Sequence, residues 1–111
     1  MRIKEVSTLL SEWRDRLNLT QWDISVYWAA SDIPPDIVGT CWWFTEEEKA
    51  EIHIRQTEDA DVEETLVHEL IHLSLEGHKE PKHSTDRHYE QGINKLARAL
   101  VRARRGQWTA N

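Results

Sequence analysis

The chain has 111 residues, which suffices for a single domain over residues 1–111 and is too short for two. Its net charge of −6 argues against nonspecific nucleic-acid binding, and its single cysteine, Cys41, excludes a fold that depends on an internal disulfide. No apolar run approaches the roughly 20 residues of a membrane helix, and the charged N-terminal segment does not resemble a signal peptide, so we expect a cytoplasmic protein with no membrane partner.

The first half of the sequence predicts one helix followed by three strands. Residues 3–17 carry apolar side chains at the spacing of an amphipathic helix. Residues 22–28 alternate apolar and polar side chains, which is the pattern of a half-buried strand. Two more strands are expected at residues 38–44 and 50–55, and their short connection predicts a hairpin. We therefore expect a three-stranded, mainly antiparallel sheet.

The second half of the sequence predicts two helices. Asp59 or Asp61 can cap a helix that is apolar around most of its circumference and ends at Gly77, so this helix should be buried. A polar loop at residues 79–84 leads to a last helix that ends near residue 105. Its inward side is expected to carry Ile93, Leu96, Ala97, Leu100 and Val101. The predicted fold class is α+β.

The end of the last helix is strongly basic. No acidic side chain follows Glu90, whereas five basic ones do: Lys95, Arg98, Arg102, Arg104 and Arg105. Such a run could contact nucleic acid, but it is more often the solvated face of a helix whose C-terminus favours positive charge. We adopt the second interpretation and expect no nucleic-acid partner.

The segment from His68 to His72, which reads His-Glu-Leu-Ile-His, places two histidines four residues apart on the buried helix. Their side chains project from one face, where two imidazole nitrogens can bind one tetrahedral metal ion. Glu69 is placed to take a proton from the attacking water rather than to bind the metal. Such polar residues are costly to bury in an apolar helix without a function. The motif therefore predicts a zinc-dependent hydrolase.

The third metal ligand has several candidates, which are Glu76, His78, His83, Asp86, His88 and Glu90. His78 has the spacing of the metzincin pattern, but Leu75 stands where that pattern needs a glycine. Helical phase separates the candidates in the last helix. Glu90 lies on the inward side with Ile93, whereas His88 lies on a mostly polar side. We therefore favour Glu90, followed by His88 and then His78.

The motif, followed by an acidic residue in a later helix, resembles the gluzincin clan of zincin metallopeptidases. The short chain resembles the minimal members of that clan, the minigluzincins and similar small phage or prophage metallopeptidases. Residues 64–70 and 89–97 resemble the active-site helix and the glutamate-bearing helix of those proteins. The resemblance covers nearly the whole chain, but only the HExxH motif is tightly diagnostic.

This resemblance implies a zincin-like fold and a function in the hydrolysis of peptide bonds. It implies one Zn²⁺ ion bound by His68, His72 and Glu90, water as the fourth ligand and Glu69 as the catalytic base. It also implies that the strand at residues 50–55 lies along the cleft rim, where it could pair with an extended peptide substrate.

Three alternatives remain open from the sequence. In a DNA-associated protease of the SprT kind, a histidine of the following helix, His88 or His83, would be the third ligand. A metal-dependent hydrolase could act on an amide other than a peptide bond. A non-catalytic, zinc-stabilised binding or regulatory domain would keep the ligands, although its metal would not need Glu69.

The remaining aromatic and histidine residues suggest secondary roles. Tyr89, His53 and His83 are candidates for stabilising the oxyanion of the tetrahedral intermediate. Trp42 and Trp43 are adjacent in a strand and must point to opposite faces, so one of them can be exposed. Trp-rich strands of this kind could support a homo-oligomer.

Overall fold

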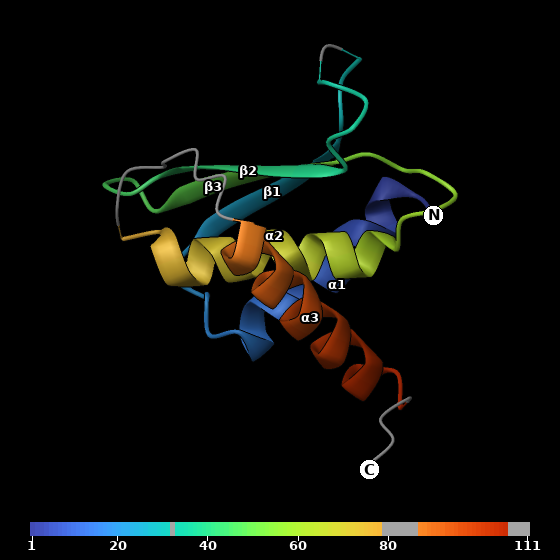
Figure 1. Ribbon diagram of the computed structural model, residues 1–111. Helices are drawn as coiled ribbons and strands as arrows, with labels where there is room; N and C mark the ends of the chain where they lie inside the picture. Colours follow the sequence, from blue (N-terminus) through green and yellow to red (C-terminus); the bar gives the residue numbers. More distant parts are fainter. Residues whose placement is uncertain (32, 79–86, 107–111) are drawn as a thin grey trace.

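Helices cover one face of a three-stranded sheet and leave the other face open (Figure 1). The computed structural model describes residues 1–31, 33–78 and 87–106, without the side chains of residues 87 and 88. In chain order the elements are α1 (Ile3–Arg16), β1 (Asp23–Trp28), β2 (Gly39–Phe44), β3 (Lys49–Ile54), α2 (Val62–Glu76) and α3 (Arg87–Arg104). This arrangement confirms the α+β class, and each predicted helix and strand of the described residues is present.

The strand order of the sheet is β1-β3-β2. The predicted hairpin of β2 and β3 is confirmed and is antiparallel, with Phe44 opposite Lys49 at its turn. β1, however, pairs with β3 in parallel, so the prediction of a mainly antiparallel sheet is wrong. The connection at residues 29–38 carries the chain from β1 past the middle position to the far edge. The hairpin then returns β3 into the gap, running in the same direction as β1.

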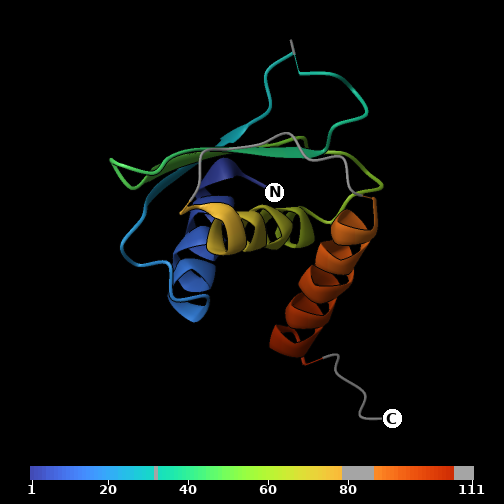
Figure 2. The same cartoon turned by 60° about the vertical axis from the view of Figure 1, so that its left-hand side comes forward.

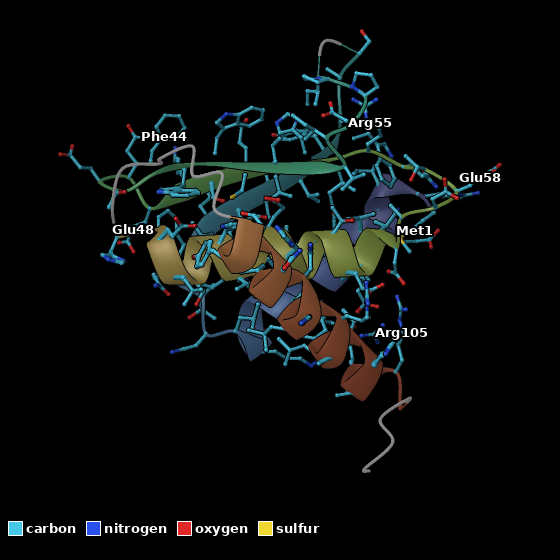
Figure 3. All side chains as sticks on the ribbon, viewed as in Figure 1. Met1, Phe44, Glu48, Arg55, Glu58 and Arg105 are labelled. Atoms are coloured by element: carbon cyan, nitrogen blue, oxygen red, sulfur yellow. The ribbon has the colours of Figure 1, made fainter. Side chains whose placement is uncertain are left out.

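Arg55 anchors this long connection, which rises above the sheet (Figure 3). Its Nη2 donates a hydrogen bond to the carbonyl oxygen of Ile33 at 2.6 Å, and its Nε donates to that of Ile37 at 3.2 Å. The Arg55 amide donates to the carbonyl oxygen of Val38 at 2.8 Å. These bonds fix the backbone immediately before β2, which borders the site described below.

The hydrophobic core lies between the helices and the inner face of the sheet. Its most completely buried apolar side chains are Val6, Ile52, Ile54, Leu66, Val67, Leu70, Leu73 and Val101. Trp43 is buried on this face, whereas Trp42 is 42% exposed on the other, which confirms that the two rings point apart. The open face also exposes Tyr27 and Phe44. None of the helices in the described residues is long and apolar enough to cross a membrane.

α2 occupies the centre of the fold and contacts α1, α3, β2 and β3 (Figure 2). Asp61 caps it as predicted, because its carboxylate accepts a hydrogen bond from the Glu64 amide at 3.1 Å. Gly77 ends it, but with an ordinary right-handed φ of −63°. Glycine is needed there for space, since a Cβ atom would lie 2.8 Å from Trp22 Cζ2.

α3 packs on α2 alone among the described elements. Its contact row has a spacing of four residues and consists of Ile93, Ala97 and Val101, all of which are buried. Leu96 was predicted to point inward but is 48% exposed, because a single partner helix covers only a narrow stripe. Leu75 of α2 is likewise 50% exposed, on a side that no described element covers.

Candidate metal centre and active site

Two histidines of α2 and one glutamate of α3 converge on one point. α3 begins in front of the middle of α2 (Figure 1). Glu90, in the first turn of α3, thereby contacts both His68 and His72. Glu90 Oε2 lies 3.0 Å from His68 Nε2, and Glu90 Oε1 lies 2.9 Å from His72 Nε2. The two Nε2 atoms are 3.1 Å apart. These side chains form a group that could hold a metal ion.

The donor atoms fit a small divalent cation. Bonds of 2.0–2.1 Å in a tetrahedral site place neighbouring donors about 3.4 Å apart, only slightly wider than the spacing of 2.9–3.1 Å found here. Without a cation, each imidazole needs a proton on Nε2 to bond Glu90, and the two N–H groups would then face each other. A cation replaces both protons and is bound by the same lone pairs.

The electrostatic environment favours the metal-binding form of His68. Burial lowers the pKa of its imidazole, and the neighbouring His72 lowers it further, while Glu90 acts in the opposite direction. The net effect is a lowered pKa, so the ring is neutral at neutral pH. Neutral imidazole is the form that offers a lone pair to a metal ion.

Glu69 lies beside this group and is almost completely buried, with 7% of its surface exposed. Burial raises the pKa of its carboxyl to about 7; His72 lowers it and Glu90 raises it. A general base works best when its pKa lies near the operating pH.

Burial, with a contribution from the charge of Glu69, also raises the pKa of the Cys41 thiol, so this thiol stays uncharged.

Gly39, the first residue of β2, brings the strand unusually close to α2. A Cβ atom at this position would lie 2.6 Å from Thr65 Cγ2 and 3.4 Å from Glu69 Cγ. The absent side chain therefore lets the backbone of β2 approach Glu69 directly. Sequence reasoning did not identify Gly39, although a glycine within a strand can signal close backbone approach.

We expect Gly39→Ala to destabilise the protein by about 1–3 kcal/mol, because the new methyl group overlaps Thr65 Cγ2. Urea denaturation measures this change. Thr65→Ser removes the methyl group but keeps the hydroxyl that donates to the Asp61 carbonyl, so the double variant should recover most of the loss. Gly92→Ala is the matched control, since nothing lies within 4 Å of its Cβ position. Equal effects of the two alanine substitutions would contradict the close approach.

A cavity of about 640 Å³ opens beside the group. Its lining includes Val38, Gly39, Thr40, Thr65, His68, Glu69, His72, Glu90, Asn94 and Ala97. β2 therefore forms its strand wall, and the prediction that residues 50–55 line the rim is wrong. β3 is paired on both sides because it lies in the middle of the sheet. β3 immediately precedes α2 in the sequence, but it does not lie at the rim of the cavity.

The other candidate ligands are not brought to this point within the described residues. His78 is exposed beyond the end of α2 and lines a separate small cavity with Trp22. His83 and Asp86 lie outside the described residues, and so does the side chain of His88. The loop predicted at residues 79–84 also lies outside them.

The candidates for oxyanion stabilisation are separated by the fold. His53 lies on the open face of the sheet, where its ring contacts Tyr27 and Trp42 with centroid distances of 5.2 and 4.8 Å. The ring of Tyr89 lies 5.7 Å from that of His72, edge to face. Of the predicted candidates in the described part of the chain, only Tyr89 therefore lies at the site.

The far end of α3 is fastened by a buried glutamate that sequence reasoning missed. Glu63 is only 1% exposed and accepts hydrogen bonds from Trp13 Nε1 at 2.7 Å, Arg104 Nη2 at 2.7 Å and Arg105 Nε at 3.1 Å. Arg105, labelled in Figure 3, also bonds Asp61 at 2.7 Å. All five basic residues of the run are exposed, as its interpretation as a solvated face predicts, but the sequence did not indicate that Arg104 and Arg105 would pair with Glu63.

No protein-family model matches the chain, and no curated protein or solved structure matches it either. The resemblance to gluzincins therefore rests on the HExxH motif, the later glutamate and the length of the chain. Independent of that resemblance, three donor side chains converge beside a buried glutamate at a cavity wall.

Proposed function

We propose that this protein is a zinc-dependent metallopeptidase with a zincin-like fold. In this proposal His68, His72 and Glu90 hold one Zn²⁺ ion, and Glu69 is the catalytic base. The observation that carries it is the convergence of these three donors, each pair 2.9–3.1 Å apart, next to the buried carboxyl of Glu69. The adjoining cavity gives a substrate access to the same point.

The donor set and its neighbour favour zinc and hydrolysis. Two imidazoles and one carboxylate are the protein ligands of many catalytic zinc sites, although iron(II) also accepts this combination. Bound there, Zn²⁺ would supply a Lewis acid that acidifies water and polarises a carbonyl group. The metal needs no help from Glu69 for binding, so the retention of this buried carboxyl supports a catalytic site.

The residues of the chain have distinct tasks in the proposed reaction. Glu69 takes the proton of the attacking water and delivers it to the leaving amine, which is general base and then general acid catalysis. The Tyr89 ring lies beside His72, but its hydroxyl bonds Glu76, so it has no proton to donate to the developing oxyanion while that bond is in place. The pKa of Glu69, raised by burial, suits it to both proton transfers near neutral pH.

The edge of β2 supports a peptide as the substrate. Among the described strands β2 pairs with β3 alone, so its other edge is not part of the described sheet. Gly39 and Thr40 of this strand line the cavity. An extended peptide could therefore add to the edge of β2 with its scissile bond near Glu69.

Two alternatives receive less support. A DNA-associated protease would be expected to offer a free basic surface, but Arg98, Arg104 and Arg105 are paired with Glu64 and Glu63. A non-catalytic zinc domain would have no use for a base beside the metal and an open cavity. Both observations weigh in favour of the peptidase.

Metal content tests the proposal directly. Elemental analysis should find about one zinc ion per native chain and per Glu69→Gln chain, because Glu69 is not a ligand. His72→Ala and Glu90→Ala should each lose the metal, whereas His88→Ala should retain it. Loss in His88→Ala and retention in Glu90→Ala would move the protein towards the SprT-like arrangement. No zinc in the native chain, even after titration, would refute the proposal.

A further inference from the structure

Glu76 makes a close contact with the proposed metal ligand His72. Its Oε2 atom lies 2.7 Å from His72 Nδ1, and the two residues are one turn apart on α2. A short hydrogen bond between an imidazole N–H and a carboxylate fixes both the tautomer and the orientation of the ring. When a metal ion takes the place of the Nε2 proton, the ring proton is therefore held on Nδ1 and the Nε2 lone pair would be available to the ion.

The geometry excludes Glu76 from the ligand group itself. His72 Nε2 faces Glu90 and His68, at 2.9 and 3.1 Å, whereas Nδ1 faces Glu76 from the other edge of the ring. A carboxylate that is bonded to Nδ1 cannot reach an ion bound at Nε2. Glu76 was one of the candidates for the third ligand in the sequence, and its place in the structure gives it a different task.

Tyr89 connects the same carboxylate to α3. The Tyr89 hydroxyl donates a hydrogen bond to the Glu76 carboxylate. The Tyr89 ring also packs edge to face against His72, with centroids 5.7 Å apart. Since Tyr89 directly precedes Glu90, Glu76 links the end of α2 to the turn of α3 that carries the third donor.

We propose that Glu76 is a positioning residue for the metal site. It holds His72 in the Nδ1–H tautomer and, through Tyr89, holds the first turn of α3 so that Glu90 meets the two histidines. The inference rests on the proposed zinc site and assigns a role that the HExxH motif does not contain. Outer partners of this kind typically contribute about 10–100-fold to metal affinity.

The test measures the zinc dissociation constant of the full chain by competition with a chromophoric chelator. Glu76→Gln keeps the size of the side chain but replaces the carboxylate, and we expect it to weaken zinc binding by about 10–100-fold. Tyr89→Phe keeps the ring against His72 and removes only the hydroxyl, so a smaller loss is expected. Glu47→Gln, in the exposed turn between β2 and β3, makes the same change in net charge away from the site and should bind zinc like the native chain.

A spectroscopic readout separates positioning from general stability. With cobalt(II) in place of zinc, the visible absorption bands of Glu76→Gln should shift relative to the native protein, because the ring of His72 is held differently. Circular dichroism and the melting temperature of the metal-free variants check that the fold persists. Native-like zinc affinity and cobalt spectra in Glu76→Gln would overturn the inference and leave the proposed function standing. Absence of zinc binding in the native chain would overturn both.

Discussion

Replacing Glu69 with glutamine is expected to lower the turnover number for a cleaved peptide by about 10²–10⁴-fold, while zinc content stays near one ion per chain. Glutamine has nearly the same shape and can occupy the same buried place between α2 and Gly39. It cannot take a proton from water, so the proton transfers of the reaction lose their carrier. A quenched-fluorescence peptide library identifies a substrate, and steady-state kinetics on that peptide measure the loss.

Measuring the zinc content of the same samples distinguishes a proton-transfer role of Glu69 from a metal-binding role. Loss of activity together with loss of zinc would mean that Glu69 serves the metal rather than the proton. Unchanged turnover would mean that another group is the base. Glu47→Gln, which removes the same charge from an exposed turn, should retain native kinetics.

The second large effect is expected at Glu63, in the first turn of α2 and away from the proposed catalytic residue Glu69. Glu63→Ala should lower the free energy of unfolding of the metal-free protein by about 2–4 kcal/mol. The variant leaves Arg104, Arg105 and Trp13 without the carboxylate that they share, and it opens a cavity in a fully covered position. Urea denaturation at pH 7 measures the change.

Glu64→Ala is the matched control for this substitution. It removes the neighbouring carboxylate, whose partner Arg98 has a side chain that is 57% exposed, so its loss should cost less than about 1 kcal/mol. Equal losses of unfolding free energy in the two variants would show that the buried hydrogen bonds of Glu63 add no stability beyond that of an exposed ion pair.

The pH dependence of stability provides a further check on the same cluster. Burial alone would raise the pKa of Glu63, but hydrogen bonds from Arg104 and Trp13 outweigh it and lower the pKa overall. The pKa of Asp61 is also lowered, chiefly by its hydrogen bond with Arg105. As the pH falls, the carboxyl groups of the unfolded chain therefore bind protons before those of Asp61 and Glu63 in the folded chain do. The free energy of unfolding should consequently decrease as the pH falls through and below the range in which ordinary carboxyl groups titrate. Glu63→Ala should show a shallower decline.

The positions of the helices and strands were predictable because each depends on local periodicity and local caps. Asp61 is the cap that the sequence indicates, and the hairpin of β2 and β3 follows from its short connection. The order of the strands was not predictable in the same way. Whether β3 lies at the edge or between its neighbours depends on the path of residues 29–38, and the hydrogen bonds that fix this path come from Arg55.

The residues of the proposed site could be predicted from the sequence because their spacing along a helix determines which side chains share a face. The side chains of His68, His72 and Glu90 do converge, and Glu69 is buried beside them. The roles of the supporting residues were not accessible. Glu63 resembles any acid in a first helical turn, and it is buried by contacts with Trp13 of α1 and Arg104 of α3, which come from distant parts of the chain.

Because α3 contacts only α2 among the described elements, metal binding at the proposed site would depend on how firmly α3 is docked. Two of the proposed donors belong to the most enclosed helix, whereas the third lies on α3, which packs on α2 alone among the described elements. Under the proposed function, zinc would bind tightly only to the fraction of molecules in which α3 is docked, and the apparent affinity would be the intrinsic affinity scaled by that fraction. Loosening the arginine end of α3 through Glu63 would then weaken zinc binding at the opposite end, with every donor intact.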